Sequence, residues 1–180
     1  MKSTIVITGT PGTGKTTLAL ALSKVISGSL LIDVNAMVKS QGLFLGYDAY
    51  GTMIADMKAL KPAVEKSIGN AAGTVILEGH LLCDMKIRGA IAIVVRCHLK
   101  DLEGRLSKRG YTGSKLSDNL VSEALDYCGI RASANYTTVF EIMGSRKQLV
   151  DDALLIIKGQ KKPGSIELSD ELVSILNKVV

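Results

Sequence analysis

Short apolar runs rich in β-branched residues alternate along the chain with longer segments of mixed polarity. The runs that predict buried strands are residues 4–8, 30–34, 74–78, 90–95 and 140–143. Buried strands that alternate with helices form parallel sheets covered on both faces, because each crossover helix packs on the sheet. The pattern therefore predicts a three-layer α/β fold.

Helical segments are expected between and after these runs, and 180 residues fit a single domain, 1–180. The expected helices are residues 16–26, 35–41, 55–68, 99–108, 118–140 and 147–158, followed by a short terminal helix capped by Ser169. The helix at 118–140 is expected to be long, with an interruption at Gly129. Residues 42–52 are rich in Gly and Tyr, which predicts a loop.

A glycine-rich segment, residues 9–16 (GTPGTGKT), follows the first predicted strand and precedes the first predicted helix. Its spacing, GxxxxGK[ST], is typical of a phosphate-binding loop. Gly12 and Gly14 allow the backbone N–H groups to turn inward as an anion nest, and the helix N-terminus adds its positive dipole end. We expect Lys15 to reach the β- and γ-phosphates of a nucleoside triphosphate and Thr16 to ligate Mg²⁺. The loop predicts the ligand class and leaves the reaction open.

An acidic residue, Glu78, ends the predicted strand at 74–78. A carboxylate at the carboxyl end of a strand beside a phosphate loop can hold Mg²⁺ through a water. His80 would share the face of Glu78 if the chain stayed extended, and would there position a water or contact a phosphate. The alternative for His80 is a surface turn, and Asp84 is expected to serve a turn.

Three arginines, Arg96, Arg105 and Arg109, follow the fourth predicted strand. Arg105 and Arg109 are four residues apart and share a helical face, so their charges repel unless an anion lies between them. Guanidinium groups suit the oxygens of a phosphoryl group during transfer. Residues 110–117, which carry Lys115, are expected to form a short mobile lid. The alternative is an exposed, solvated basic helix.

Composition and charge narrow the class of protein. The chain is 47% hydrophobic and 4% aromatic, which predicts an aliphatic core suited to a parallel sheet. A formal charge of +5 fits a protein that handles polyanions, without establishing RNA binding. The chain has an odd number of cysteines, Cys83, Cys97 and Cys128, and no CxxC spacing. This favours buried reduced thiols over a disulfide framework or a zinc site. No apolar stretch has the length of a membrane span or signal peptide, so we expect a cytoplasmic protein with no membrane contact.

Together these residues resemble the adenylate kinase isoenzyme 6 family, in particular its archaeal branch. The resemblance spans nearly the whole chain and keeps the order of the family's motifs. The phosphate loop is generic, whereas RLSKRGYTGSKLSDN (105–119) and PGSIELSDEL (163–172) are far more specific. The other matching pieces are GTPGTGKTT (9–17), GYD (46–48), VILEGH (75–80) and the spacing from Glu123 to Tyr136.

The resemblance implies a nucleoside monophosphate kinase fold with a five-stranded parallel sheet, a monophosphate-binding segment at about 30–53 and a short lid at about 108–118. The implied reaction is transfer of a phosphoryl group from ATP to AMP, giving two ADP, with Mg²⁺. The family is also implicated in maturation of the small ribosomal subunit, which implies a small-subunit ribosomal protein and rRNA as partners. By matched position, the residues that bind ATP are Gly12, Gly14, Lys15, Thr16, Thr17 and Arg109.

The chain departs from the family pattern on the monophosphate side. Adenylate kinases typically clamp the AMP phosphate with arginine, yet residues 30–73 contain none, and Lys39 stands where the resemblance would place one. Lysine lacks the bidentate fork of arginine, so weaker monophosphate binding is expected. Glu78 also replaces the Asp of some members. The lid segment lacks the cysteines of a zinc-bearing lid, so no structural metal is expected.

The residues leave three functions open. In an adenylate kinase, Lys15, Arg105, Arg109 and Mg²⁺ would neutralise the moving phosphoryl group while the lid excludes water. In an ATPase assembly factor, the ATP cycle would gate binding to a ribosomal protein or rRNA, which the net charge and the missing arginine favour. A sugar or shikimate kinase would share the loop but leaves the lid match unexplained. Three residues could contact the monophosphate or be purely structural: Tyr47, Asp48 and Asp56.

Overall fold

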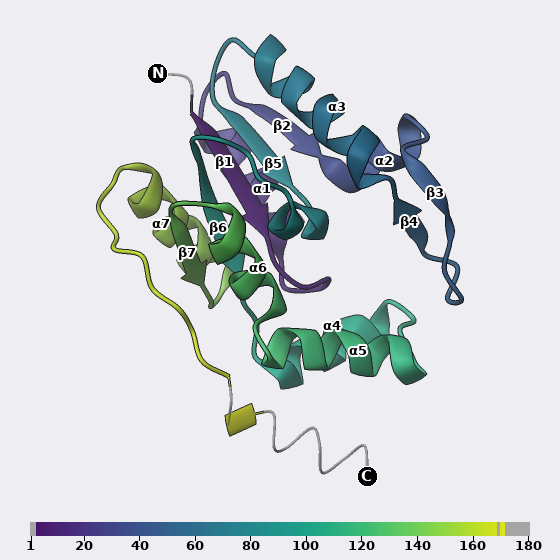
Figure 1. Ribbon diagram of the computed structural model, residues 1–180. Helices are drawn as coiled ribbons and strands as arrows, with labels where there is room; N and C mark the ends of the chain where they lie inside the picture. The colour runs from purple at the N-terminus through teal and green to yellow at the C-terminus, as the bar shows by residue number, and fades with distance from the viewer. Residues whose placement is uncertain (1–2, 169, 172–180) are drawn as a thin grey trace.

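A five-stranded parallel sheet lies at the centre of the protein, with helices on both faces (Figure 1). The computed structural model describes residues 3–168 and 170–171; Ser169, the expected helix cap, lies outside them, as does most of the expected terminal helix. The strands, in spatial order, are β2 (Leu30–Asp33), β5 (Val75–Glu78), β1 (Thr4–Thr8), β6 (Ala90–Val95) and β7 (Val139–Ile142). The predicted three-layer α/β fold and its five strands are confirmed.

Seven α-helices and one short 3-10 helix lie within the described residues. They are α1 (Lys15–Val25), α2 (Val34–Ser40), α3 (Met57–Asn70), η1 (His80–Asp84), α4 (Leu99–Lys108), α5 (Gly113–Ala124), α6 (Tyr127–Asn135) and α7 (Arg146–Ile157). Alternate residues of β1 point to opposite sides, so Ile5 and Ile7 pack with α1 and α7 while Val6 packs with α2, α3, η1 and α6. Burying each such aliphatic side chain contributes about 1.5–3 kcal/mol, which makes the sheet a firm base for the loops at its edge.

The register of the sheet aligns the carboxyl ends of its central strands. Ile7 of β1 pairs with Glu78 of β5, and Thr8 pairs with Val94 of β6. The loop that follows Thr8 therefore emerges beside Glu78. This placement follows from parallel pairing and agrees with the general position of ligand sites in open α/β sheets.

The expected loop at residues 42–52 is instead a two-stranded antiparallel hairpin, made of β3 (Phe44–Tyr47) and β4 (Met53–Ala55). Its turn is closed by Asp48, whose carboxylate accepts hydrogen bonds from the backbone N–H groups of Tyr50 and Thr52, both at 2.8 Å. The hairpin projects from the sheet beyond α2 (Figure 1). The prediction was wrong because Gly46 lies at the irregularity of β3 and Gly51 in the turn of the hairpin, so neither ends the pairing.

The long helix expected at 118–140 is also wrong, because the chain forms α5 and α6 with a break at Asp126. Asp126 adopts a left-handed conformation with φ 53°, and its carboxylate accepts a hydrogen bond from the N–H of Gly129 at 3.1 Å. Gly129 lies inside α6 rather than at the break. A Cβ there would stand 2.4 Å from the Asp126 carboxylate, so glycine is required to make room for the cap.

The expected lid segment, residues 110–117, is partly helical, because α5 begins at Gly113. Helices α4 and α5 form a helical hairpin below the sheet in Figure 1, with an apolar cluster of its own. Leu99, Leu102, Leu106 and Leu120 are its large buried members. No helix within residues 3–168 and 170–171 is long and apolar enough to cross a membrane.

Candidate functional site

The loop between β1 and α1 has the backbone that its glycines predict. The φ values of Gly9, Gly12 and Gly14 are +138°, +94° and +112°, which residues other than glycine rarely adopt. A Cβ on Gly9 would stand 2.4 Å from the carbonyl oxygen of Val95, and one on Gly12 would stand 2.9 Å from the side chain of Leu102. The loop therefore passes close to β6 and to α4, and its shape depends on glycine at both positions.

Lys15 is the first residue of α1 and is only 6% exposed. Its ammonium group donates a hydrogen bond to the carbonyl oxygen of Thr10 at 3.0 Å. Burial lowers the pKa of Lys15, whereas the carboxylates of Glu78 and Glu123 raise it. The side chain is thus a buried cation at a helix N-terminus, which is the arrangement that attracts an oxyanion.

A cavity of about 240 Å³, which we call the phosphate-loop cavity, opens over this helix end. It brings together nearly all of the residues predicted to bind the triphosphate and the metal, although they come from four separate parts of the chain. It is lined by Pro11, Gly12, Gly14, Lys15, Thr16, Thr17, Asn35, Glu78, His80, Arg109 and Tyr111.

Thr16 and Glu78 both line this cavity and bring a hydroxyl and a carboxylate to it. Burial raises the pKa of Glu78, and the charge of Lys15 and the nearby Thr16 hydroxyl offset only part of this rise. A hydroxyl and a carboxylate oxygen fit Mg²⁺, which prefers hard oxygen ligands and usually keeps water and phosphate in its remaining positions. In the described part of the chain, no cluster of three or more His, Cys, Asp or Glu side chains could hold a metal by itself.

His80 does not continue an extended strand after Glu78, as was expected, but begins the 3-10 helix η1. It still reaches the site, because it lines both the phosphate-loop cavity and a neighbouring one. Burial and the charge of Lys15 lower the pKa of His80 to about 4. Its imidazole is therefore neutral near pH 7.

Arg105 and Arg109, expected on one helical face, take different positions: Arg105 lies within α4, whereas Arg109 is the residue that ends it. Arg109 lines the phosphate-loop cavity. Arg105 lies behind the loop, where its Nη1 donates to the carbonyl oxygens of Gly12 and Thr13, both at 3.3 Å. Both arginines line a further cavity of about 230 Å³ on that side of the loop. Arg105 therefore braces the loop, and Arg109 is the one placed to meet an anion in the phosphate-loop cavity.

A second cavity of about 360 Å³ lies beside the first and shares Pro11, His80 and Tyr111 with it. The β3–β4 hairpin and α5 meet over it: Ser114 Oγ donates to the Tyr50 hydroxyl at 2.8 Å, and Lys115 Nζ donates to Thr52 Oγ1 at 3.0 Å. Its remaining lining residues are Thr10, Asp48, Cys83, Asp84, Asp118, Asn119, Ser122, Tyr127 and Cys128.

The second cavity carries more acidic than basic groups. Its lining contains three carboxylates, from Asp48, Asp84 and Asp118, and one lysine side chain, Lys115. Asp84 also forms an ion pair with Arg131. Lys39, expected in place of the missing arginine, is exposed and is not among the lining residues.

The structure gives different positions to Tyr47, Asp48 and Asp56, the three residues that could contact the monophosphate or be purely structural. Asp56 caps α3 by accepting hydrogen bonds from Lys58 and Ala59, a structural role. Tyr47 is 62% exposed, and Asp48 both closes the hairpin turn and lines the second cavity.

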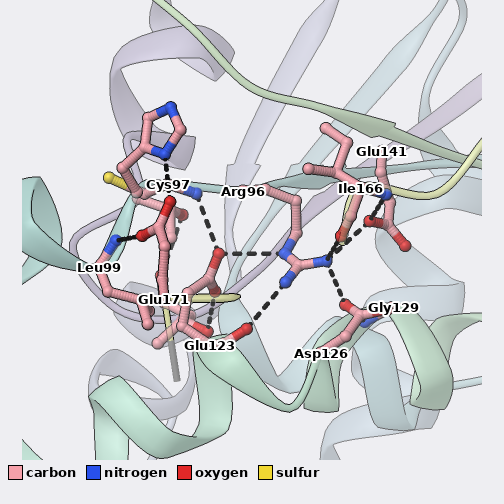
Figure 2. A network of polar contacts seen from close by, with 12 residues as sticks. Arg96, Cys97, Leu99, Glu123, Asp126, Gly129, Glu141, Ile166 and Glu171 are labelled. Carbon is pink, nitrogen blue, oxygen red and sulfur yellow. Dashed lines mark hydrogen bonds and ion pairs between the residues drawn. The ribbon is translucent and has the colours of Figure 1, made fainter. Parts of the chain in front are cut away.

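Arg96 is not a phosphate ligand but the centre of a buried ionic network (Figure 2). Its Nε donates to Glu123 Oε1 at 3.0 Å, and its Nη1 lies 2.7 Å from both Glu141 Oε2 and Asp126 Oδ1. Nη1 also donates to the carbonyl oxygen of Ile166 at 3.0 Å. The guanidinium group thereby joins β6, α5, β7 and the segment that follows α7.

Glu123 extends this network to the phosphate loop. Its carboxylate accepts hydrogen bonds from the hydroxyl of Thr10 at 2.5 Å and from the N–H of Cys97 at 2.9 Å. Glu171 accepts from the N–H of Leu99 at 2.7 Å and so caps α4 (Figure 2). Sequence reasoning missed this network; the one available signal was a charged residue, Arg96, directly after an apolar strand.

Comparison with known proteins places these features in a family. The AAA domain family matches residues 5–126. A protein of Methanothermobacter thermautotrophicus named "Putative adenylate kinase" is 39% identical over 150 residues, which cover 82% of this chain and 78% of that protein. A protein of Methanosarcina barkeri with the same name is 33% identical over 179 residues, covering 91% and 96%.

A solved structure supports the fold alone. Shikimate kinase from Acinetobacter baumannii in complex with shikimate superposes with a TM-score of 0.65 at 14% identity, over 89% of this chain and 96% of that one. The structure therefore has a P-loop kinase fold, in agreement with the five-stranded sheet and the loop at residues 9–16. On sequence identity and coverage, the chain belongs to the AAA domain family and to the archaeal group of proteins named "Putative adenylate kinase".

Proposed function

We propose that this protein is an adenylate kinase, which transfers the terminal phosphoryl group of ATP to AMP reversibly and yields two ADP. The observation that carries the proposal is the wall shared by the two cavities, formed by Pro11, His80 and Tyr111. A triphosphate on the loop and an acceptor in the second cavity would meet at that wall. Positioning two reactants in line accounts for most of the catalysis in phosphoryl transfer. The names of the archaeal relatives support AMP as the acceptor.

The donor side would be held by the phosphate loop. The N–H groups around Gly12 and Gly14 and the ammonium of Lys15 would bind the phosphates, and Arg109 would neutralise charge on the group in transfer. Thr16 and Glu78 would hold Mg²⁺, directly or through water. When bound, the ion would supply charge neutralisation between the β- and γ-phosphates. Two further residues named from the sequence would help: Thr17 at the phosphates, and Arg105 by bracing the loop.

The acceptor side would lie between the β3–β4 hairpin and the α4–α5 hairpin. These correspond to the monophosphate-binding segment at about 30–53 and the lid at about 108–118. The contacts of Tyr50 with Ser114 and of Thr52 with Lys115 support closure of the two hairpins over the second cavity. Closure would exclude water, the competing acceptor. His80, at the shared wall, would position the acceptor, and Lys115 would offset the absence of an arginine.

A second candidate is an ATPase whose cycle serves maturation of the small ribosomal subunit, with a ribosomal protein or rRNA as partner. The observation in its favour is the acidic lining of the second cavity, because Asp48, Asp84 and Asp118 oppose a dianionic monophosphate. In that case water would accept the phosphoryl group and AMP transfer would be incidental.

The test measures ADP formed from ATP and Mg²⁺ with AMP, without AMP, and with shikimate or gluconate. We expect AMP to stimulate turnover strongly and to give two ADP for each ATP consumed. Lys15→Ala should lower the rate by about 10²–10³, since it removes a preorganised charge at the transferred group. Lys39→Ala is the matched control, because Lys39 is an exposed lysine outside both cavities, and it should change the rate less than about twofold.

Three outcomes separate the candidates. Turnover that ignores AMP and rises with a small-subunit ribosomal protein would favour the ATPase. Transfer to shikimate or gluconate at a higher rate than to AMP would favour a small-metabolite kinase. A Lys15→Ala rate within about twofold of the unmodified protein, as expected for Lys39→Ala, would remove the proposed donor site.

A further inference from the structure

Two thiols lie together in the wall of the second cavity. Cys83 comes from η1 and Cys128 from α6, and both line the cavity although they are only 1% and 6% exposed. The two thiols are close enough for each to shift the pKa of the other. The sulfur of Cys83 also lies 3.1 Å from the carbonyl oxygen of His80. The pair is thus shielded from bulk solvent but open to a small molecule that enters the cavity.

The two elements that carry the thiols are fixed against each other at both ends of α6. At its C-terminal end, the Tyr136 hydroxyl donates to the carbonyl oxygen of Leu82 at 2.7 Å, and Asn135 Nδ2 donates to that of Cys83 at 3.0 Å. Nearer its N-terminal end, Tyr127 and Arg131 both contact the carboxylate of Asp84. These contacts hold η1 against α6 where both thiols line one cavity, which is the placement that a bond between them requires.

The surroundings make the two thiols chemically unequal. Cys128 is the second residue of α6, so it lies at the positive end of the helix dipole. The neighbouring Cys83 lowers the pKa of Cys128 most, and the charge of Lys15 and the Thr10 hydroxyl lower it further, against burial and Glu123. Cys128 and burial raise the pKa of Cys83. These effects and the helix dipole favour Cys128 as the nucleophile of the pair and Cys83 as the thiol that keeps its proton.

We propose that Cys83 and Cys128 form a peroxide-sensitive dithiol that closes to a disulfide in the wall of the second cavity. The Cys128 thiolate attacks one oxygen of hydrogen peroxide, the O–O bond breaks, and the leaving hydroxide takes a proton to become water. The sulfur of Cys83 then displaces hydroxide from the Cys128 sulfenic acid, and its own proton converts that hydroxide to a second water. Overall, two thiols and one peroxide give one disulfide and two waters.

The expected consequence is loss of the second cavity's function. The bond would tie η1 to α6 at the wall next to Thr10 and would withdraw Cys128 from its contact with the Thr10 hydroxyl. We expect phosphoryl transfer to stop in the oxidised protein and to return when a dithiol reductant opens the bond. This last consequence rests on the proposed function, whereas formation of the disulfide does not.

The chain contains a matched control in Cys97. Cys97 is 4% exposed, like the pair, but it packs in the apolar cluster of α4 and α5 and does not line the second cavity. Burial raises the pKa of Cys97 to about 11. A buried thiol of this kind is inert, so peroxide should oxidise it at least about tenfold more slowly than Cys128.

The experiment treats the full native chain with hydrogen peroxide, blocks remaining thiols with an alkylating reagent, and maps the peptides by mass spectrometry. We expect one intramolecular disulfide between Cys83 and Cys128, with Cys97 alkylated as a free thiol. Cys83→Ser should instead accumulate a Cys128 sulfenic acid that dimedone traps, because its partner is missing. Cys97→Ala should form the disulfide at the wild-type rate. Circular dichroism and thermal unfolding confirm that each variant is folded.

The proposal is overturned if Cys97 oxidises as fast as Cys128, if Cys128 passes to sulfinic acid without pairing, or if the disulfide forms only after unfolding. Activity adds an independent readout: the ADP-forming rate of Cys128→Ser, relative to its own untreated value, should not respond to peroxide. If the reduced protein shows no transfer to AMP while the disulfide still forms, the proposed function fails and the dithiol stands.

Discussion

Glu123 and Glu141 offer a matched pair for separating stability from ligand binding, because both are buried partners of Arg96 but only Glu123 bonds the phosphate loop. Their side chains are 1% and 5% exposed. Removing one partner of a buried ion pair leaves the other charge uncompensated and costs about 3–5 kcal/mol. We therefore expect Glu123→Ala and Glu141→Ala to lower the free energy of unfolding by similar amounts, within this range.

The two variants should differ in their affinity for ATP. Loss of Glu123 releases the hydroxyl of Thr10, whose carbonyl oxygen holds Lys15 at 3.0 Å. If that release costs about 1.4 kcal/mol of ligand binding, ATP affinity falls about tenfold. Glu141 bonds Arg96 and not the loop, so Glu141→Ala should leave the ATP affinity within about threefold of the unmodified protein. Thr10→Val should reproduce the affinity loss with a smaller effect on unfolding, since the ion pairs stay intact.

Unfolding is measured by urea titration followed by circular dichroism, and ATP binding by calorimetry at a temperature where each variant is folded. The glutamine variants, Glu123→Gln and Glu141→Gln, replace the alanine variants if either of those does not fold. The reasoning is refuted if both glutamates lower ATP affinity equally, or if Glu123→Ala changes the free energy of unfolding by less than about 1 kcal/mol.

Three further predictions concern stability and are checked by urea unfolding. Gly9→Ala should lower the free energy of unfolding by more than about 3 kcal/mol, because its Cβ would stand 2.4 Å from a carbonyl oxygen of β6. Gly42→Ala, also at positive φ but in open space, should cost about 1 kcal/mol, and equal losses would exclude the steric cause. Gly129→Ala should destabilise the protein by about 2 kcal/mol, because the methyl group would displace the Asp126 cap. Alanine normally stabilises a helix by about 1 kcal/mol relative to glycine, so a stabilised variant would contradict this reasoning. Tyr136→Phe leaves a buried carbonyl oxygen of η1 without its 2.7 Å hydrogen bond and should cost about 1–2 kcal/mol; no change would mean that water replaces the hydroxyl.

Much of the fold and the donor side of the site could be predicted because both follow from local patterns. Apolar runs predict buried strands, and parallel pairing then brings their carboxyl ends together. That reasoning placed Glu78 beside Lys15, where the structure also has it. The glycines of the loop were predictable for the same reason, since a motif of fixed spacing carries its own backbone requirements.

The errors lie where long-range contacts decide the outcome. Arg96 looked like one of three arginines available to an anion, but three acidic side chains distant in sequence surround it in the structure. The break at Asp126 needs a left-handed non-glycine residue, which sequence patterns disfavour and which the ionic network stabilises. The β3–β4 hairpin was missed because each strand is short and half exposed, so its apolar pattern is weak.

The order in which the partners of Arg96 are synthesised has a consequence for folding. Glu123, Glu141 and Ile166 follow Arg96 by 27, 45 and 70 residues. A growing chain that has just completed β6 therefore carries a guanidinium group that cannot be buried until much later segments have emerged. The amino-terminal strands can associate early. The phosphate loop and the N-terminal end of α4 are expected to reach their final form only after residue 166 has been synthesised. We expect nascent chains that end before this point to stay sensitive to proteases near Arg96, since an unpaired buried charge opposes closure of the core.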